Sequence, residues 1–116
     1  MLTNTITIIV TKQQILDFAN LTGDNSSIHL VDGIVQSGLI LSMLPQWSNV
    51  AKDDGNFILP NNNITSKFDC KFRNPLFADT PYNITFTYEP LKLQFYKITW
   101  QIEKNCSGVW IIRSLS

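Results

Sequence analysis

The stretch that decides the fold is IVQSGLILSMLPQW, residues 34–47. Its apolar residues leave no polar stripe, so a helix formed here is buried on most of its sides. A helix from Ser37 to Trp47 is roughly 16 Å long. Pro45 either kinks this helix or ends it nearby. We expect a polar loop to follow over residues 48–63.

Beyond residue 63 the sequence takes on the alternation of half-buried strands. Apolar and polar side chains alternate over residues 64–73, 82–89 and 96–103. Each stretch indicates a strand with one wet face. The stretch KNCSG at residues 104–108 is a hairpin turn into a last strand over 108–115. Cys70 falls on the apolar face of the first of these strands, which predicts a core position.

Upstream of the central stretch, the pattern predicts a strand, a helix and a loop. Alternating apolar residues over residues 5–10 indicate a short strand. Thr11 with Gln14 three residues later is a capping-box pattern, and the helix that it begins should end near Gly23. Residues 24–33 are polar and rich in turn-forming residues, so they predict a loop that holds the chain's single histidine.

These elements together predict an α+β fold with one domain over residues 1–116. The apolar faces of the strands must pack against another layer, and the apolar helix must be surrounded by other elements. An antiparallel sheet wrapped around a central buried helix satisfies both. A length of 116 residues fits one domain. The balance of 44% hydrophobic to 16% charged residues is that of a globular protein.

Charge and hydropathy exclude several classes of partner. Nine basic and nine acidic residues give a formal net charge of zero, with no basic cluster to bind nucleic acid or a membrane surface. The longest apolar run, residues 38–44, is too short to span a bilayer. Residues 1–10 lack the features of a signal peptide, so we expect a cytoplasmic protein. One histidine and no CxxC pair provide no metal-ligand spacing, so no metal is predicted.

Asp24 and His29 are the residues best suited to chemistry. Four residues separate them within one predicted loop. A carboxylate can orient a water or hold an imidazole tautomer, and the imidazole can move a proton near neutral pH. The spacing alone is also explained by an aspartate that caps a turn and an ordinary hydrogen-bonding histidine.

Ser37 and Gly38, at the start of the central helix, form a second candidate group. Free backbone N–H groups at a helix N-terminus can bind a developing oxyanion. The alternative is that Ser37 is an ordinary N-cap and that Gly38 only allows close packing. Ser42 lacks the GxSxG context of a nucleophile, and we expect its hydroxyl to bond to a carbonyl one turn earlier.

The stretch from Thr11 to Pro45 resembles the MaoC-like (R)-specific enoyl-thioester hydratases, which are hotdog proteins. Residues 18–24, FANLTGD, match the family pattern FA-x-L-[ST]-G-D in full, and Asp24 and His29 stand at the spacing of the family loop D-x-N-P-[IL]-H. The central helix is similar to the I-A-H-G-Y-L-T-L-S-L-L-P of one subgroup, and KFRNPL to the family's R-F-x-x-P-V. The resemblance covers nearly the whole chain.

The chain departs from the family pattern at several positions. Ser26 and Ser27 replace the Asn and Pro of the loop, the family His falls on Gln36, and the family Gly falls on Ser37. Only residues 30–33 follow His29 before the central stretch begins. The family has a longer segment there that helps to shape the acyl pocket, so the resemblance implies no acyl length.

The resemblance implies a hydratase/dehydratase that interconverts trans-2-enoyl and (R)-3-hydroxyacyl thioesters of coenzyme A or acyl carrier protein, with no cofactor. Asp24 and His29 would jointly hold the water, and the amide of Ser37 or Gly38 would polarise the thioester oxygen. Two alternatives stay open. One is a hotdog acyl-thioesterase, and the other is a catalytically silent acyl-binding subunit.

The family habit of pairing two hotdog domains implies a homodimer. A single chain would leave an edge strand unpaired and would expose apolar residues such as Trp100 or Trp110. Two-fold pairing is the commonest way to close such a surface. We expect two equivalent sites, each with Asp24 and His29 from one chain and part of the pocket wall from its partner.

Overall fold

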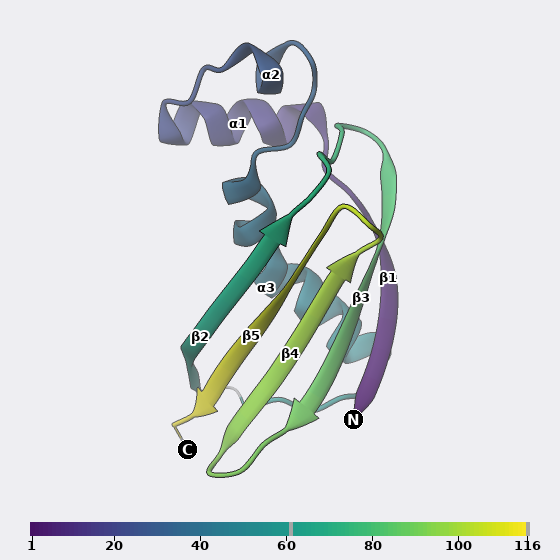
Figure 1. Cartoon of the computed structure of the whole chain (residues 1–116), viewed down its shortest axis with the longest axis vertical. Coiled ribbons are helices and arrows are strands. Elements are labelled where there is room, and N and C mark those ends of the chain that lie inside the picture. The colour runs from purple at the N-terminus through teal and green to yellow at the C-terminus, as the bar shows by residue number, and fades with distance from the viewer. Residues whose placement is uncertain (61, 116) are drawn as a thin grey trace.

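The computed structural model describes residues 1–60 and 62–115. Its elements are β1 (Leu2–Ile9), α1 (Lys12–Thr22), α2 (Ser27–Leu30), α3 (Ser37–Asp54), β2 (Asn63–Phe72), β3 (Pro81–Pro90), β4 (Phe95–Ile102) and β5 (Cys106–Ser114). The strands form one antiparallel sheet in the order β1-β3-β4-β5-β2. In Figure 1, α3 crosses behind the sheet while α1 and α2 lie at one end. The predicted α+β fold is therefore confirmed.

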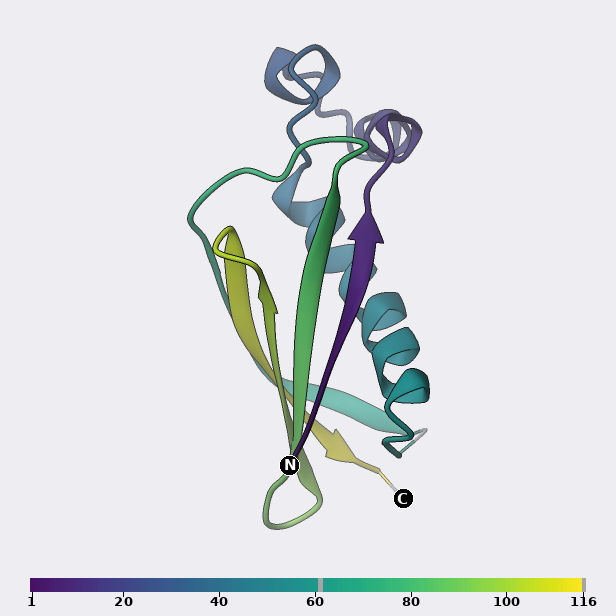
Figure 2. The same ribbon diagram turned by 90° about the vertical axis from the view of Figure 1, so that its right-hand side faces the viewer.

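The core lies between α3 and the concave face of the sheet, which curves around the helix in Figure 2. The helix buries Leu39, Ile40, Leu44, Trp47, Ser48 and Ala51. The sheet faces them with Ile84, Phe86, Tyr88, Ile98, Trp100, Ile102 and Ile112, all buried. Each large apolar side chain contributes about 1.5–3 kcal/mol when it leaves water. This single layer therefore supplies most of the stabilising burial.

Helix α3 continues through Pro45 to Asp54, so the prediction that the helix gives way to a loop soon after the proline was wrong. A proline inside a helix removes one N–H and crowds a carbonyl one turn back. The helical turns beyond Pro45 nevertheless bury Trp47 and Ala51, and the free energy of this burial offsets the cost of the lost hydrogen bond. The side-chain amide of Asn4 on β1 also donates to the Ala51 carbonyl at 2.8 Å. Tertiary contacts thus stabilise the helix beyond the proline that would otherwise end it.

Strand β2 lies at the edge of the sheet, and all ten of its residues are exposed in the single chain. The expectation of a half-buried strand with Cys70 in the core was therefore wrong, since Cys70 is exposed. The reason is that α3 packs against β1, at the opposite edge of the sheet. The apolar side chains of Ile64, Phe68 and Phe72 consequently remain open to solvent.

Trp100, which we expected at the surface of a single chain, is fully buried within it. It lies opposite Gly108 on the neighbouring strand β5. A Cβ atom at Gly108 would stand 2.6 Å from the Trp100 ring and 2.4 Å from the backbone oxygen of Asp69 on β2. The indole therefore occupies the space that a side chain at position 108 would need.

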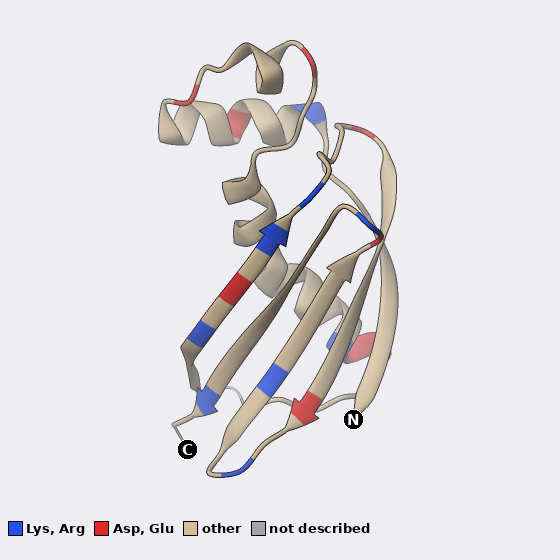
Figure 3. Ribbon diagram, viewed as in Figure 1, with Lys and Arg blue, Asp and Glu red and all other residues tan. Residues whose placement is uncertain are grey.

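Charged residues of both signs are spread along the chain (Figure 3). On β2, Lys67 and Asp69 pair at 3.3 Å, and on α3, Lys52 and Asp53 pair at 3.2 Å. None of the helices in the described part of the chain has the length and apolar character needed to cross a membrane.

We predict that Gly108→Ala lowers the free energy of unfolding by at least about 1–3 kcal/mol, because the new methyl group overpacks a site walled by a ring and by backbone. Urea denaturation followed by far-UV circular dichroism measures the change. Ser107→Ala, at a partly exposed neighbouring position, is the control and should stay within about 0.5 kcal/mol of the parent. Equal stability of the two variants would show that β2 or Trp100 moves aside freely.

Candidate active site

Helix α1 ends at the point where Asp24 must be presented. The predicted capping box is present at its start. The backbone N–H of Gln14 donates to the Thr11 hydroxyl at 3.1 Å, and the backbone N–H of Thr11 donates to the side-chain oxygen of Gln14 at 2.8 Å. Gly23 ends the helix in the left-handed conformation, φ 77°, and its N–H donates to the Ala19 carbonyl at 2.8 Å. Both predictions are confirmed. Asp24 follows this cap directly, so the end of α1 fixes its backbone.

His29 lies on α2, a one-turn helix inside the segment that we predicted to be only a loop. The turn forms because the N–H groups of His29 and Leu30 both donate to the carbonyl of Ser26, at 3.1 and 3.2 Å. The imidazole is largely buried, with 13% of its side chain exposed. Its Nδ1 lies 2.7 Å from the carbonyl oxygen of Ile34, so the ring is anchored at this nitrogen.

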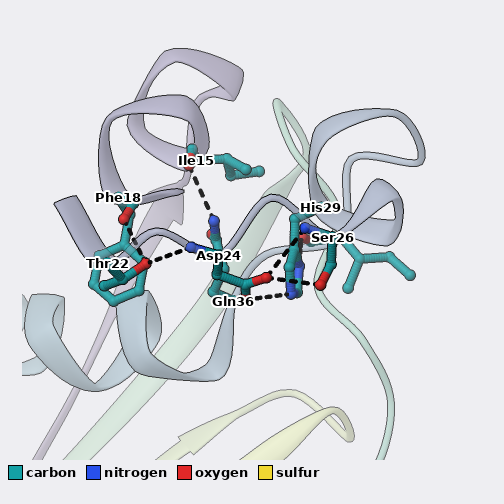
Figure 4. A network of polar contacts seen from close by, with 8 residues as sticks. Ile15, Phe18, Thr22, Asp24, Ser26, His29 and Gln36 are labelled. Atoms are coloured by element: carbon teal, nitrogen blue, oxygen red, sulfur yellow. Dashed lines mark hydrogen bonds and ion pairs between the residues drawn. The ribbon is translucent and has the colours of Figure 1, made fainter. Parts of the chain in front are cut away.

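The structure brings the side chains of Asp24 and His29 together (Figure 4). Asp24 Oδ2 lies 3.5 Å from His29 Nε2. The carboxylate is the more open partner, with 43% of its side chain exposed. The two groups therefore face each other at a place that solvent or a small molecule can reach.

The hydrogen bond at Nδ1 determines what this pair can hold. A carbonyl oxygen only accepts, so in the neutral ring Nδ1 carries the proton and Nε2 is left as an acceptor. An ionised Asp24 is also an acceptor only. Two acceptors cannot bond to each other, but one water can donate a hydrogen bond to each. Such a water keeps its oxygen lone pairs free for attack on an electrophile.

The second carboxylate oxygen of Asp24 is already occupied. Asp24 Oδ1 accepts from the Ser26 hydroxyl at 2.7 Å and from the Ser26 amide at 3.1 Å. The hydroxyl bond, then the amide bond, and more weakly the nearby His29 lower the pKa of the Asp24 carboxyl, against a smaller opposing effect of desolvation. Asp24 therefore stays ionised further into the acid range than a free aspartate.

The N-cap of α3 is Gln36, not Ser37 as one of our two alternatives had it. The side chain of Gln36 makes no capping bond, because it is buried and its Nε2 donates to the Ile15 carbonyl on α1 at 3.0 Å. Ser37 and Gly38 thus open the helix, where the first N–H groups have no partner inside the helix. In Figure 4 the Gln36 side chain reaches the Ile15 carbonyl, and the Ile34 carbonyl that contacts His29 lies two residues before Gln36.

Close packing at Gly38, the second part of the same alternative, is what the structure shows. A Cβ atom at Gly38 would lie 3.0 Å from the ring of Phe18 on α1. The absence of a side chain therefore lets α1 press against the first turn of α3. The hydroxyl of Ser42 donates to the Leu39 carbonyl at 2.8 Å, which confirms its structural role.

Two residues of this network were not singled out as functional from the sequence. Ser26 stands two positions after Asp24, a spacing at which an aspartate commonly bonds to the backbone in a turn. That signal was available. Gln36 is only a polar residue inside the apolar stretch IVQSGL, and nothing in the sequence shows that its amide reaches α1. Its Oε1 is buried with no hydrogen-bond partner among the described residues.

Other reactive groups of the described chain lie elsewhere. Burial raises the pKa of the Cys106 thiol to about 12, which leaves it without a thiolate to attack a substrate. A cavity of about 500 Å³ runs along the second half of α3, between Pro45 and Lys52 on the helix and Trp110 and Ile112 on β5. Its lining does not include Asp24 or His29. Within residues 1–60 and 62–115, no three His, Cys, Asp or Glu side chains gather as a metal site.

No protein-family model matches the chain, and no curated protein matches its sequence. Solved structures match it in shape. An (R)-hydratase from A. caviae has a TM-score of 0.73 at 13% identity over 97% of this chain and 94% of its own. The R-hydratase PhaJ1 from Pseudomonas aeruginosa has a TM-score of 0.69 at 14% identity, over 97% of this chain and 79% of its own. A thioesterase from Thermus thermophilus, solved with coenzyme A and zinc, has a TM-score of 0.66 at 11% identity, over 97% of this chain and 84% of its own. The fold is therefore the hotdog fold.

We predict that the neutral ring of His29 carries its proton on Nδ1. Because this is the only histidine of the chain, a long-range ¹⁵N–¹H NMR spectrum of the ¹⁵N-labelled protein at alkaline pH assigns the tautomer without ambiguity. A proton found on Nε2 would contradict the prediction. Nε2 would then donate to Asp24, and the pair could no longer accept two hydrogen bonds from one water.

Proposed function

We propose that the protein is a hydratase/dehydratase that interconverts trans-2-enoyl and (R)-3-hydroxyacyl thioesters carried by coenzyme A or acyl carrier protein. The observation that carries the proposal is the facing of Asp24 Oδ2 and His29 Nε2 at 3.5 Å, with Nδ1 anchored on a carbonyl. The amides of Ser37 and Gly38 open α3 and have no acceptor inside the helix. These amides, and the hotdog fold shared with (R)-hydratases, support the proposal.

In the proposed reaction, Asp24 and His29 each accept a hydrogen bond from one water, whose oxygen bonds to C3 of the enoyl thioester. One water proton passes to the pair as the C2–C3 π electrons move toward the thioester oxygen. The amides of Ser37 and Gly38 stabilise the resulting enolate, as an oxyanion hole does. The proton held by the pair then goes to C2, which restores the pair for the next turnover. Dehydration is the same sequence in reverse.

Two other functions have an observation in their favour. A carboxylate-held water can also hydrolyse a thioester, and the fold is shared with a thioesterase, which favours an acyl-thioesterase as the second candidate. The replacement of the family His by Gln36 and of the family Gly by Ser37 favours a catalytically silent acyl-binding subunit. Both use the same fold and the same end of α3.

We predict that the protein consumes the enoyl absorbance of crotonyl-CoA without releasing free thiol. Asp24→Asn and His29→Ala should each lower the rate by several powers of ten with the fold intact, because both residues act on one water. Asp32→Asn, an exposed aspartate of the same segment, is the control and should keep the parent rate.

The same assay separates the rivals. Release of free thiol would identify a thioesterase. Protein that binds a long-chain acyl thioester yet turns over no enoyl substrate, across a panel of increasing acyl length on both carriers, would identify the silent subunit.

We further propose that the protein acts as a homodimer, joined at β2. An edge strand presents unpaired N–H and C=O groups, and β2 adds the exposed side chains of Ile64, Phe68 and Phe72. A second copy that pairs along this edge would cover both at once. Each site would then take Asp24 and His29 from one chain and part of its pocket wall from the partner.

Sedimentation equilibrium at micromolar concentration should give a mass of twice 13.2 kDa. Phe72→Lys on β2 should shift the equilibrium toward the monomer, because a charge cannot be buried unpaired at the interface. Phe77→Lys changes an exposed phenylalanine outside β2 and should leave the mass unchanged. A mass near 13.2 kDa with full hydratase activity would rule out a dimer that builds the site.

A further inference from the structure

Ser26 is bonded to both members of the candidate site. Its hydroxyl and its amide both donate to Asp24 Oδ1, at 2.7 and 3.1 Å. Its carbonyl accepts from the His29 amide at 3.1 Å. Ser26 is also the N-cap of α2, yet its side chain makes no capping bond to that helix. The hydroxyl is committed to Asp24 instead.

The two bonds to Oδ1 restrict the rotation of the carboxyl group. The Asp24 side chain is 43% exposed, and an exposed aspartate otherwise rotates about its χ angles at little cost. Bonds to an ionised oxygen are short and strong, so the donors of Ser26 hold Oδ1 away from the histidine. The remaining oxygen, Oδ2, is thereby left facing His29 Nε2 at 3.5 Å.

We propose that Ser26 is a positioning residue of this site: its hydroxyl holds Asp24 so that Oδ2 and His29 Nε2 address the same water. The proposal rests on the proposed function. The residue is this chain's own solution, because the family pattern has an asparagine at this position. Ser26 touches neither the water nor the substrate in this role, and acts only through Asp24 and the backbone of α2.

The charges around Asp24 make the role measurable by pH. From α2, His29 faces the carboxylate and helps to keep it ionised. On α1, the carboxylate of Asp17 accepts from the Gln13 side chain at 2.8 Å. The first turn of α3 carries no acidic residue. The hydrogen bonds from Ser26 therefore have the largest effect on the titration of Asp24.

The sign of the effect follows from these bonds. They favour the ionised carboxyl and lower its pKa. Removal of the hydroxyl raises the pKa toward its ordinary value. If hydration requires ionised Asp24, the acidic limb of the rate profile must move to higher pH in Ser26→Ala. A change confined to folding would lower the rate at every pH and leave the limb in place.

The experiment compares Ser26→Ala, the conservative Ser26→Thr and the control Ser27→Ala, a neighbouring serine whose side chain is not part of the network. Crotonyl-CoA hydration is measured across pH, and the Asp24 carboxyl is titrated by ¹³C NMR. We expect Ser26→Ala to lose about ten- to hundredfold in plateau kcat, as for a lost bond to a charged group, with both the limb and the carboxyl pKa raised. Ser26→Thr and Ser27→Ala should keep the parent values.

An Asp24 pKa that is unchanged in Ser26→Ala overturns the proposal, because the hydroxyl then does not hold the carboxylate. A raised pKa with an unchanged plateau kcat also overturns it, because the hold then does not matter for the reaction. A parent protein that hydrates no enoyl thioester refutes the proposed function instead. In that case the NMR titration by itself still decides whether Ser26 holds Asp24.

Discussion

The burial of α3 is the constraint on which the other parts of the structure depend. The sequence predicted burial on most sides of this helix, whereas the buried residues Leu39, Ile40, Leu44, Trp47, Ser48 and Ala51 follow one face of it. The sheet curves around that face and removes it from water. Gln36 and Gly38 attach the first turn of α3 to α1, one by a bond to the Ile15 carbonyl and the other by leaving room for the ring of Phe18. The same contacts bring the end of α1, and with it Asp24, to the start of α3.

The curvature that buries α3 also leaves one strand uncovered. The helix packs toward β1, so β2 at the far edge of the sheet gains no cover from its own chain. The side chains of β2 are exposed in the single chain, and the buried core residues lie on the other elements. The packing of the core and the covering of β2 are therefore independent of each other. A partner at β2 would cover that strand, and the core would not need it.

Features encoded by a few neighbouring residues could be predicted from the sequence. The capping box of Thr11 and Gln14 and the left-handed Gly23 are local, and the alternation in β3 and β4 follows from strand geometry alone. Features decided by distant contacts could not. The passage of α3 through Pro45 depends on burial against the sheet, and the exposure of Cys70 depends on where α3 lies. Neither is a property of the local pattern.

The candidate site divides in the same way. The spacing of Asp24 and His29 could be read from the sequence, but their relative orientation is set by two groups that no motif named: the Ser26 hydroxyl and the Ile34 carbonyl. Gln36 adds a further constraint. An amide donates to the Ile15 carbonyl at any pH, whereas an imidazole at the same position would titrate near neutrality. Because the side chain of Gln36 joins the start of α3 to α1, this hydrogen bond between the two helices is independent of pH.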